Sequence, residues 1–116
     1  MEHDLDQLFQ FTPQEQAIFE REQNLYSLIK TIEYLEWAYM SGKIDGPKYD
    51  QEFRKLLHNY QETEKGIPQF MGIDQFVKKY QLDHCQTAMQ RIKAKKSGYQ
   101  GEEMNQGLAV RVLEIT

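Results

Sequence analysis

Apolar residues recur at alternating steps of three and four along residues 25–60, in two runs that a short polar segment separates. The nine positions that set this rhythm are Leu25, Leu28, Ile32, Leu35, Tyr39, Tyr49, Phe53, Leu56 and Tyr60. Such spacing gathers side chains along one stripe of each helix, and two stripes of this kind can face each other. The pattern therefore predicts a helical hairpin whose core is formed by these nine residues.

Four further apolar residues flank the stripe, namely Tyr26, Ile29, Trp37 and Leu57. They make the apolar faces wider than a single facing helix needs. Two interpretations follow. The remaining helices of the chain close a wider core, or these four residues form a surface on which helices of other subunits dock.

The first helix of the hairpin has a clear beginning and end. Thr12 and Glu15 have the spacing of a capping box, and Pro13 suits the first helical position. The helical pattern then continues without a breaker to Ser41 and Gly42, where glycine can adopt the left-handed cap conformation.

The second helix is predicted to begin after an N-cap at Asp45 and to run to about Lys65. Because the connection is short, the two long helices must be antiparallel. Two shorter helices follow, one over residues 73–80 and one from an N-cap at Asp83 to about residue 96. The predicted fold class is all-α: a long antiparallel helical hairpin followed by two shorter helices.

The chain divides into three predicted parts. Residues 1–11 form an N-terminal segment that is acidic and carries a few apolar residues, with the spacing of a short amphipathic helix. Residues 12–96 form the helical core domain. Residues 97–116 begin as a polar linker, become apolar again, and are interpreted as the start of a further, C-terminal domain.

Composition narrows the class of protein. With 116 residues the chain corresponds to one small domain or a fragment of a larger protein. It contains no apolar run near the ~20 residues of a membrane span, and its acidic N-terminus is unlike a signal peptide or a mitochondrial presequence. Cys85 is the only cysteine, which fits a reducing compartment. We therefore expect a cytosolic protein.

The net charge of −4 is unevenly distributed. Residues 67–100 carry six basic and two acidic residues, whereas residues 1–66 carry seven basic and thirteen acidic ones. The lysines that could contact acidic lipid are Lys78, Lys79, Lys93, Lys95 and Lys96. A solvated helix face explains the same charges more simply. Because the whole chain is acidic, we expect no nucleic-acid partner.

No arrangement of residues typical of catalysis is present. His3, His58 and His84 are scattered, and His84 next to Cys85 would point in a different direction on a helix. A tetrahedral metal site needs three or four convergent ligands, so we expect no metal and no other cofactor. The glycines are isolated, which excludes a glycine-rich phosphate loop. We expect a protein that is not an enzyme and has no small-molecule substrate; protein–protein interaction remains.

Several short motifs occur in a fixed order along residues 22–95. They are Leu35-Glu36-Trp37-Ala38-Tyr39, Pro47 to Tyr49, Leu56-Leu57 with Tyr60, Ile73-Asp74-Gln75-Phe76 with Lys79, Tyr80, Leu82 and Asp83, and Ala88 to Lys93. Together they resemble the N-terminal core domain of the vacuolar protein sorting-associated protein 28 family, a subunit of the ESCRT-I complex. Each motif is weak alone, and their order makes the resemblance specific.

The resemblance implies a non-catalytic assembly subunit of the ESCRT-I headpiece. In that family the domain joins hairpins from vacuolar protein sorting-associated proteins 23 and 37, and the complex sorts ubiquitinated cargo into multivesicular bodies. It further implies a cytoplasmic protein that is recruited peripherally, with a weak membrane contact, to endosomes. Family members also carry a C-terminal helical bundle, whose function is not assigned to these residues.

Two other functions compete with this one. A self-contained helical interaction domain would use the aromatic stripes as its own core. A peripheral module for anionic membranes would use the basic residues between positions 78 and 96. Periodicity and charge alone do not separate the three.

Overall fold

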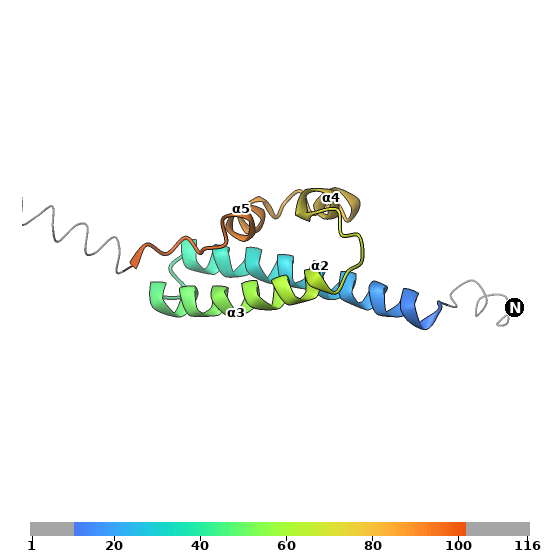
Figure 1. The fold of residues 1–116 in the computed structure, drawn as a ribbon. Helices are drawn as coiled ribbons and strands as arrows, with labels where there is room; N and C mark the ends of the chain where they lie inside the picture. The colour runs from blue at the N-terminus through green and yellow to red at the C-terminus, as the bar shows by residue number, and fades with distance from the viewer. Residues whose placement is uncertain (1–10, 102–116) are drawn as a thin grey trace, which may run out of the picture.

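A computed structural model describes residues 11–101 of the chain, and within that range it contains helices and no strand. The helices are α2 (Pro13–Met40), α3 (Gly46–Lys65), α4 (Ile73–Lys79) and α5 (Gln86–Ala94). Two long helices lie side by side and two short ones follow (Figure 1). The predicted fold class is therefore confirmed. The predicted segment 1–11, apart from Phe11, and residues 102–116 lie outside the described residues.

Helix α2 begins with the predicted capping box. The Thr12 hydroxyl accepts a hydrogen bond from the Glu15 backbone amide at 3.1 Å, and the Glu15 carboxylate accepts one from the Thr12 amide at 3.2 Å. The helix ends at Met40, and Gly42 adopts a positive φ of 75° in the turn that follows. A residue with a Cβ would be strained at this φ, so the reversal of the chain at this position favours glycine.

Helix α3 also begins and ends where the sequence predicts. The Asp45 carboxylate accepts a hydrogen bond from the Lys48 amide at 2.8 Å, and Gly66 forms the C-cap. Near the far end of the hairpin the Asn24 side chain donates to the Thr63 hydroxyl at 2.9 Å. Beyond this contact the first turns of α2 project past the end of α3 (Figure 1).

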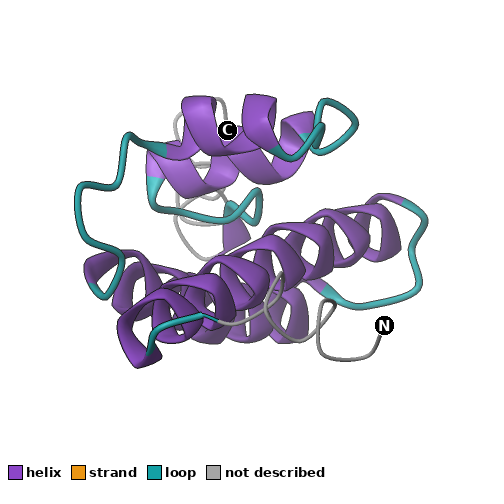
Figure 2. Cartoon of the chain, turned by 90° about the vertical axis from the view of Figure 1, so that its right-hand side faces the viewer, coloured by secondary structure: helices purple, strands orange, loops and turns teal. Residues whose placement is uncertain are grey.

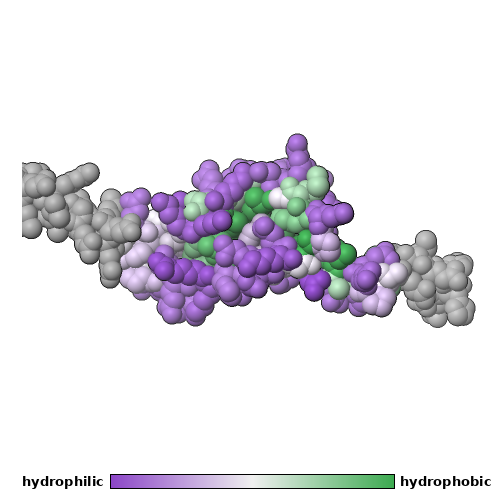
Figure 3. Space-filling view, viewed as in Figure 1, coloured by the Kyte–Doolittle hydropathy of each residue, from purple (hydrophilic) through white to green (hydrophobic). Residues whose placement is uncertain are grey.

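The short helices form a second layer on one side of the hairpin (Figure 2). Helix α5 packs mainly on α2. The buried core joins the two layers through Ile29 of α2, Phe76 and Val77 of α4, and Ala88 and Ile92 of α5. Apolar side chains visible on the face in Figure 3 gather along this junction. The core is thus wider than a hairpin seam because α4 and α5 cover a second face of α2.

All nine residues of the predicted hairpin core lie in or beside this core. Six are buried: Leu25, Leu28, Ile32, Tyr49, Phe53 and Tyr60. Leu35 and Leu56 are partly buried against it, and Tyr39 stacks on Tyr49 with ring centroids 4.0 Å apart. The three partly buried residues therefore lie at the edges of the seam.

The start of the last helix differs from the prediction. Asp83 is not the N-cap, because a turn in which the Cys85 amide donates to the Leu82 carbonyl places Cys85 there instead. Gln86, the expected capping partner, donates from its side chain to the Asp83 backbone carbonyl at 2.9 Å. The helix also ends at Ala94, before residue 96. The Asp83–Gln86 spacing is typical of a capping box, but here both residues take part in the local turn that leads into the helix.

The packed body also continues past the predicted domain boundary at residue 96. Ser97 is buried, and its hydroxyl donates to the Asp50 carboxylate. The Gly98 amide donates to the Tyr49 hydroxyl at 2.8 Å. These two contacts with α3 attach the beginning of the predicted linker to the hairpin, and they join residues almost fifty positions apart, which local sequence does not reveal.

Candidate protein-binding surface

A row of large apolar side chains is exposed on the C-terminal half of α2. Tyr34, Trp37 and Met40 are 55%, 46% and 65% exposed and follow one another at steps of three. The Tyr34 and Trp37 rings meet edge to face with centroids 5.5 Å apart. We call these three residues the α2 aromatic surface. Exposed aromatic residues next to one another on a regular helix are typical of protein-binding sites.

The Trp37 ring is held in place by a buried carboxylate. Its indole N–H donates to Glu33 Oε2 at 2.7 Å. The other oxygen of Glu33 accepts the backbone amide of Ala88 at 2.8 Å, and Glu33 is only 3% exposed. Because Cys85, the N-cap of α5, makes no side-chain capping bond, Glu33 of α2 caps α5 in its place.

A second buried carboxylate lies one turn further along α2. Glu36 is 1% exposed, and its Oε1 accepts a hydrogen bond from Arg91 of α5 at 2.9 Å. This bond raises the pKa of Arg91. Burial, together with the Glu36 carboxylate, raises the pKa of Tyr49 well above its usual value. Glu36 Oε2 makes no hydrogen bond within residues 11–101.

Sequence reasoning did not identify these two glutamates as structural. They lie among Ile29, Ile32 and the other apolar positions of α2, on the side that faces α5. The available signal was a pair of acidic residues inside an apolar stripe. A carboxylate on such a face is buried only when it is paired or hydrogen-bonded, so the pattern indicates a structural partner. Their partners, Ala88 and Arg91, are 55 residues away in the chain, so no local pattern names them.

The four residues predicted to meet partner helices have different environments. Trp37 is exposed as part of the α2 aromatic surface. Tyr26 is partly buried and packs edge to face on Tyr80, and Leu57 is partly buried against the core. Ile29 has no exposed surface, so in this structure it belongs to the internal core and not to a surface that a partner could reach. The reason is that the chain's own short helices already cover it.

A second exposed apolar site lies at the projecting end of α2. Phe11 and Phe19 are about half exposed, and their rings stack with centroids 5.7 Å apart. This end of the helix has no facing helix within the described residues, because α3 stops earlier (Figure 1). Phe11 and Phe19 are therefore available to bind an additional element.

The lysines proposed for lipid contact are exposed, but they do not form one free patch. Lys79 pairs with Glu22 at 3.2 Å, and Lys93 pairs with Asp74 at 2.6 Å. The other three, Lys78, Lys95 and Lys96, make no ion pair within the described part of the chain. None of the helices in residues 11–101 is long and apolar enough to cross a membrane.

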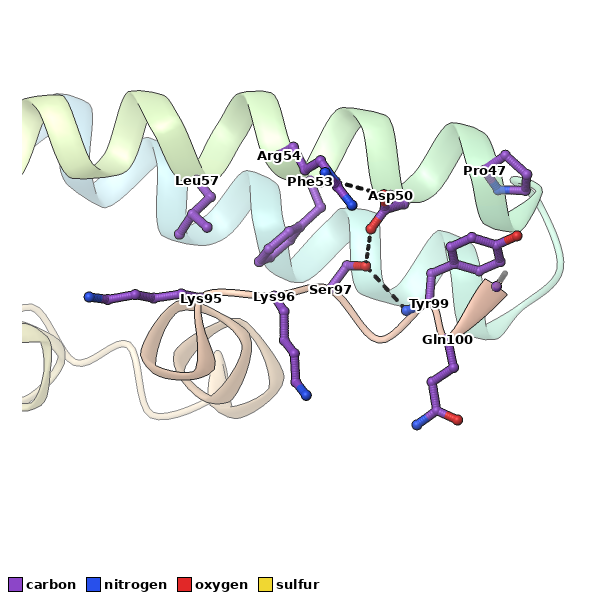
Figure 4. Close-up of a pocket in the computed structure, with 11 residues that line it drawn as sticks. Pro47, Asp50, Phe53, Arg54, Leu57, Lys95, Lys96, Ser97, Tyr99 and Gln100 are labelled. Atoms are coloured by element: carbon purple, nitrogen blue, oxygen red, sulfur yellow. Dashed lines mark hydrogen bonds and ion pairs between the residues drawn. The ribbon is translucent and has the colours of Figure 1, made fainter. Parts of the chain in front are cut away.

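A groove of about 670 Å³ lies between α3 and residues 95–101. Its wall includes Phe53 and Leu57, and Figure 4 shows its acid, Asp50, already engaged by Arg54 and Ser97. An acid held by two partners is poorly suited to proton transfer. Among the described residues, no three side chains of metal-ligating type gather in one place.

The lone thiol is shielded from solvent. Cys85 has no exposed surface, and its pKa is raised by burial and by the nearby Glu33 carboxylate. A thiol is a nucleophile or metal ligand only as the thiolate, which both effects disfavour. Burial thus keeps the Cys85 thiol in its protonated, unreactive form.

Comparison with known proteins gives a consistent result. The family model described as VPS28 protein matches residues 23–116. A vacuolar protein sorting-associated protein 28 homolog of Caenorhabditis elegans is 32% identical over 79 residues, and the match covers 64% of this chain and 37% of that protein. The Dictyostelium discoideum vacuolar protein sorting-associated protein 28 is 30% identical over 67% of this chain and 27% of its own length. The chain thus spans about a third of the curated relatives it matches.

Proposed function

Because the chain belongs to the VPS28 family, we propose that it is a non-catalytic assembly subunit of an ESCRT-I complex, which supports sorting of ubiquitinated cargo into multivesicular bodies. The names of its relatives place them in vacuolar protein sorting. In this role the chain works at the cytoplasmic face of endosomes. Its contribution is a helical surface that holds other subunits together.

The α2 aromatic surface is the observation that carries this proposal. Tyr34, Trp37 and Met40 expose apolar area on α2, the long helix on which the rest of the fold packs. Tyr and Trp are the side chains that most often dominate interface energetics. We assign this surface to the helical hairpins of the partner subunits, vacuolar protein sorting-associated proteins 23 and 37.

The alternative of a self-contained helical domain has support in one respect. Helices α4 and α5 close the core over Ile29, so the chain buries much of its own stripe. A domain that served only its own core would gain by burying Trp37 as well, at about 25 cal/mol per Å² of apolar area. The exposure of Trp37 and its neighbours favours assembly.

Co-purification of the full chain with both partner subunits tests the proposal. Tyr34→Asp combined with Met40→Asp should reduce recovery of the complex at least ~10-fold, because a charged side chain at these two positions cannot be buried against a partner helix. The pair leaves the Trp37–Glu33 bond in place, so helical content by circular dichroism should remain.

Met71→Asp is the matched control, since Met71 is 78% exposed but lies in the connection between α3 and α4. It should bind like the wild type. A folded double variant that still co-purifies with the partners would contradict the proposal. A pair that includes Ile29 would not be informative, because that residue belongs to the internal core.

We also infer a weak peripheral contact with anionic membranes through Lys78, Lys95 and Lys96, which are the three of the five candidate lysines that make no ion pair among the described residues. A basic residue near such a surface contributes about 1 kcal/mol, so three give only modest affinity. Flotation with phosphatidylserine vesicles should fall for Lys95→Glu with Lys96→Glu. It should change little for the control pair Lys43→Glu with Lys55→Glu. An equal loss of flotation for both pairs would show that net charge, and not this group of lysines, determines binding, and would contradict the inference.

A further inference from the structure

Glu33 joins two parts of the molecule that are far apart in the sequence. One of its carboxylate oxygens caps α5 through the Ala88 amide at 2.8 Å, and the other accepts the Trp37 indole N–H at 2.7 Å. The carboxylate is almost fully buried between them. Both oxygens are used, so a change in either bond alters the position or the solvation of the group that makes the other.

We propose that Glu33 is a positioning residue that couples the docking of α5 to the presentation of Trp37 on the α2 aromatic surface. A partner that binds Trp37 in this orientation would then also stabilise docked α5. The identity of the partner rests on the proposed function, whereas the coupling is a property of this chain alone.

Helix α5 is short enough to need such a contact. It has nine residues, and an isolated helix of that length is marginal in water. Only Ala88 and Ile92 of this helix are buried and Met89 is partly buried, so its apolar contact with the hairpin is small. The polar contacts from Glu33 and Glu36 therefore contribute a large share of what holds it on α2.

The coupling also restricts the kind of partner. The indole N–H is already bonded to Glu33, so the exposed part of Trp37 offers only ring carbons. The ring fits the apolar face of a helix. A partner carboxylate or carbonyl placed at the indole nitrogen would compete with Glu33 and would release α5.

The chain carries a natural probe at each of the two coupled sites, the exposed tryptophan and the start of α5. Trp37 is the only tryptophan, so fluorescence quenching by iodide reports its exposure. Cys85 is the only cysteine, forms the N-cap of α5 and has no exposed surface. Its reaction with a maleimide requires the start of α5 to open, so the labelling rate reports undocking.

Substitution of Glu33 tests the coupling in one direction. In Glu33→Gln the side chain keeps its shape, but an NH2 donor replaces one of the two carboxylate oxygens, so one of the two N–H groups loses its acceptor. We expect Cys85 labelling to accelerate about 10-fold and iodide quenching of Trp37 to increase. Glu36→Gln is the control, because Glu36 is also buried and bonded to α5 but makes no hydrogen bond with the Trp37 indole. It should accelerate labelling and leave quenching close to wild type.

Substitution of Trp37 tests the opposite direction, since coupling between two sites is reciprocal. Trp37→Phe keeps an aromatic ring and removes the N–H, and it should accelerate Cys85 labelling several-fold although the position is nearly half exposed. Tyr34→Phe changes the neighbouring ring, which has no bond to Glu33, and should leave labelling unchanged.

The results separate this inference from the proposed function. Unchanged labelling in Trp37→Phe together with unchanged quenching in Glu33→Gln would overturn the coupling, whether or not partners bind. Slower Cys85 labelling of the wild-type chain in the partner complex supports both proposals. Failure of the wild type to bind partners would remove the proposed function and leave the two substitutions as the test of coupling.

Discussion

Two regions of this molecule, the α2–α3 hairpin and the layer formed by α4 and α5, are held by different interactions. The hairpin is joined by an apolar seam that includes Leu25, Ile32 and Phe53. The contact between α5 and α2 adds two buried carboxylates, Glu33 and Glu36, to a smaller apolar core. The same helix thus presents an apolar face to one neighbour and a partly polar face to the other.

The two kinds of contact specify different properties of the fold. Apolar contact is not directional, so a seam tolerates small shifts between its helices. A buried carboxylate must meet its donors at hydrogen-bond distance, or it costs free energy. Glu33 and Glu36 therefore determine where α5 lies along α2, whereas the seam supplies most of the stability.

Phe53→Ala removes a fully buried ring from the seam. We expect a loss of about 3–5 kcal/mol in the free energy of unfolding, the usual range for a buried phenylalanine. Urea denaturation followed by circular dichroism measures it. The whole domain should lose stability together, so a loss that spared α2 and α3 would argue against the hairpin as the main source of stability.

Arg91→Met leaves the Glu36 carboxylate buried without its partner. Loss of one member of a buried pair costs about 3–5 kcal/mol, and the lower end applies because Arg91 is partly exposed. We expect Cys85 labelling to accelerate more than the urea midpoint falls, because the damage is local to α5. Replacing Glu36 by Gln in the same chain should recover part of the loss.

Leu56→Ala tests the edge of the seam. Leu56 and Leu35 lie in the middle of the two arms, where a fully buried leucine would cost about 2–5 kcal/mol on truncation to alanine. Both are only partly buried, so we expect about 1–2 kcal/mol, in proportion to the smaller area removed from water. A cost equal to that of Leu25→Ala, a fully buried leucine of the same seam, would show that the edge is packed as tightly as the centre.

Lys79→Gln removes an exposed ion pair with Glu22 and should change the unfolding free energy by less than about 0.5 kcal/mol. Glu22 keeps a second contact, because the Tyr80 hydroxyl donates to it; burial and this bond raise the pKa of Tyr80 to about 12. Thermal unfolding at low and high salt provides the measurement. A larger loss that disappears in high salt would mean that surface charge, rather than apolar packing, attaches α4.

The helices themselves were largely predictable. The capping box at Thr12, the N-cap at Asp45 and the glycine turn after Met40 are local signals, and each occurs where the sequence predicts it. The start of α5 was not, because Glu33 supplies its cap from another helix. A cap that comes from a distant residue leaves no trace in the sequence near the helix it completes.

The candidate site was predicted less completely. Both Trp37 and Ile29 lie beside the stripe and were predicted to meet a partner, yet Trp37 is exposed and Ile29 is internal. Periodicity gives the face of a helix on which a residue lies, but not which neighbour covers that face.

Local pattern is therefore sufficient for the length, ends and pairing of α2 and α3, because helix periodicity and capping act over a few residues. The packing of the chain on itself decides the rest: which apolar residues are left outside, and which acids are buried. Those outcomes depend on contacts between residues about 55 positions apart, such as Glu33 with Ala88 and Glu36 with Arg91. The free energy of such contacts exists only once the helices have met.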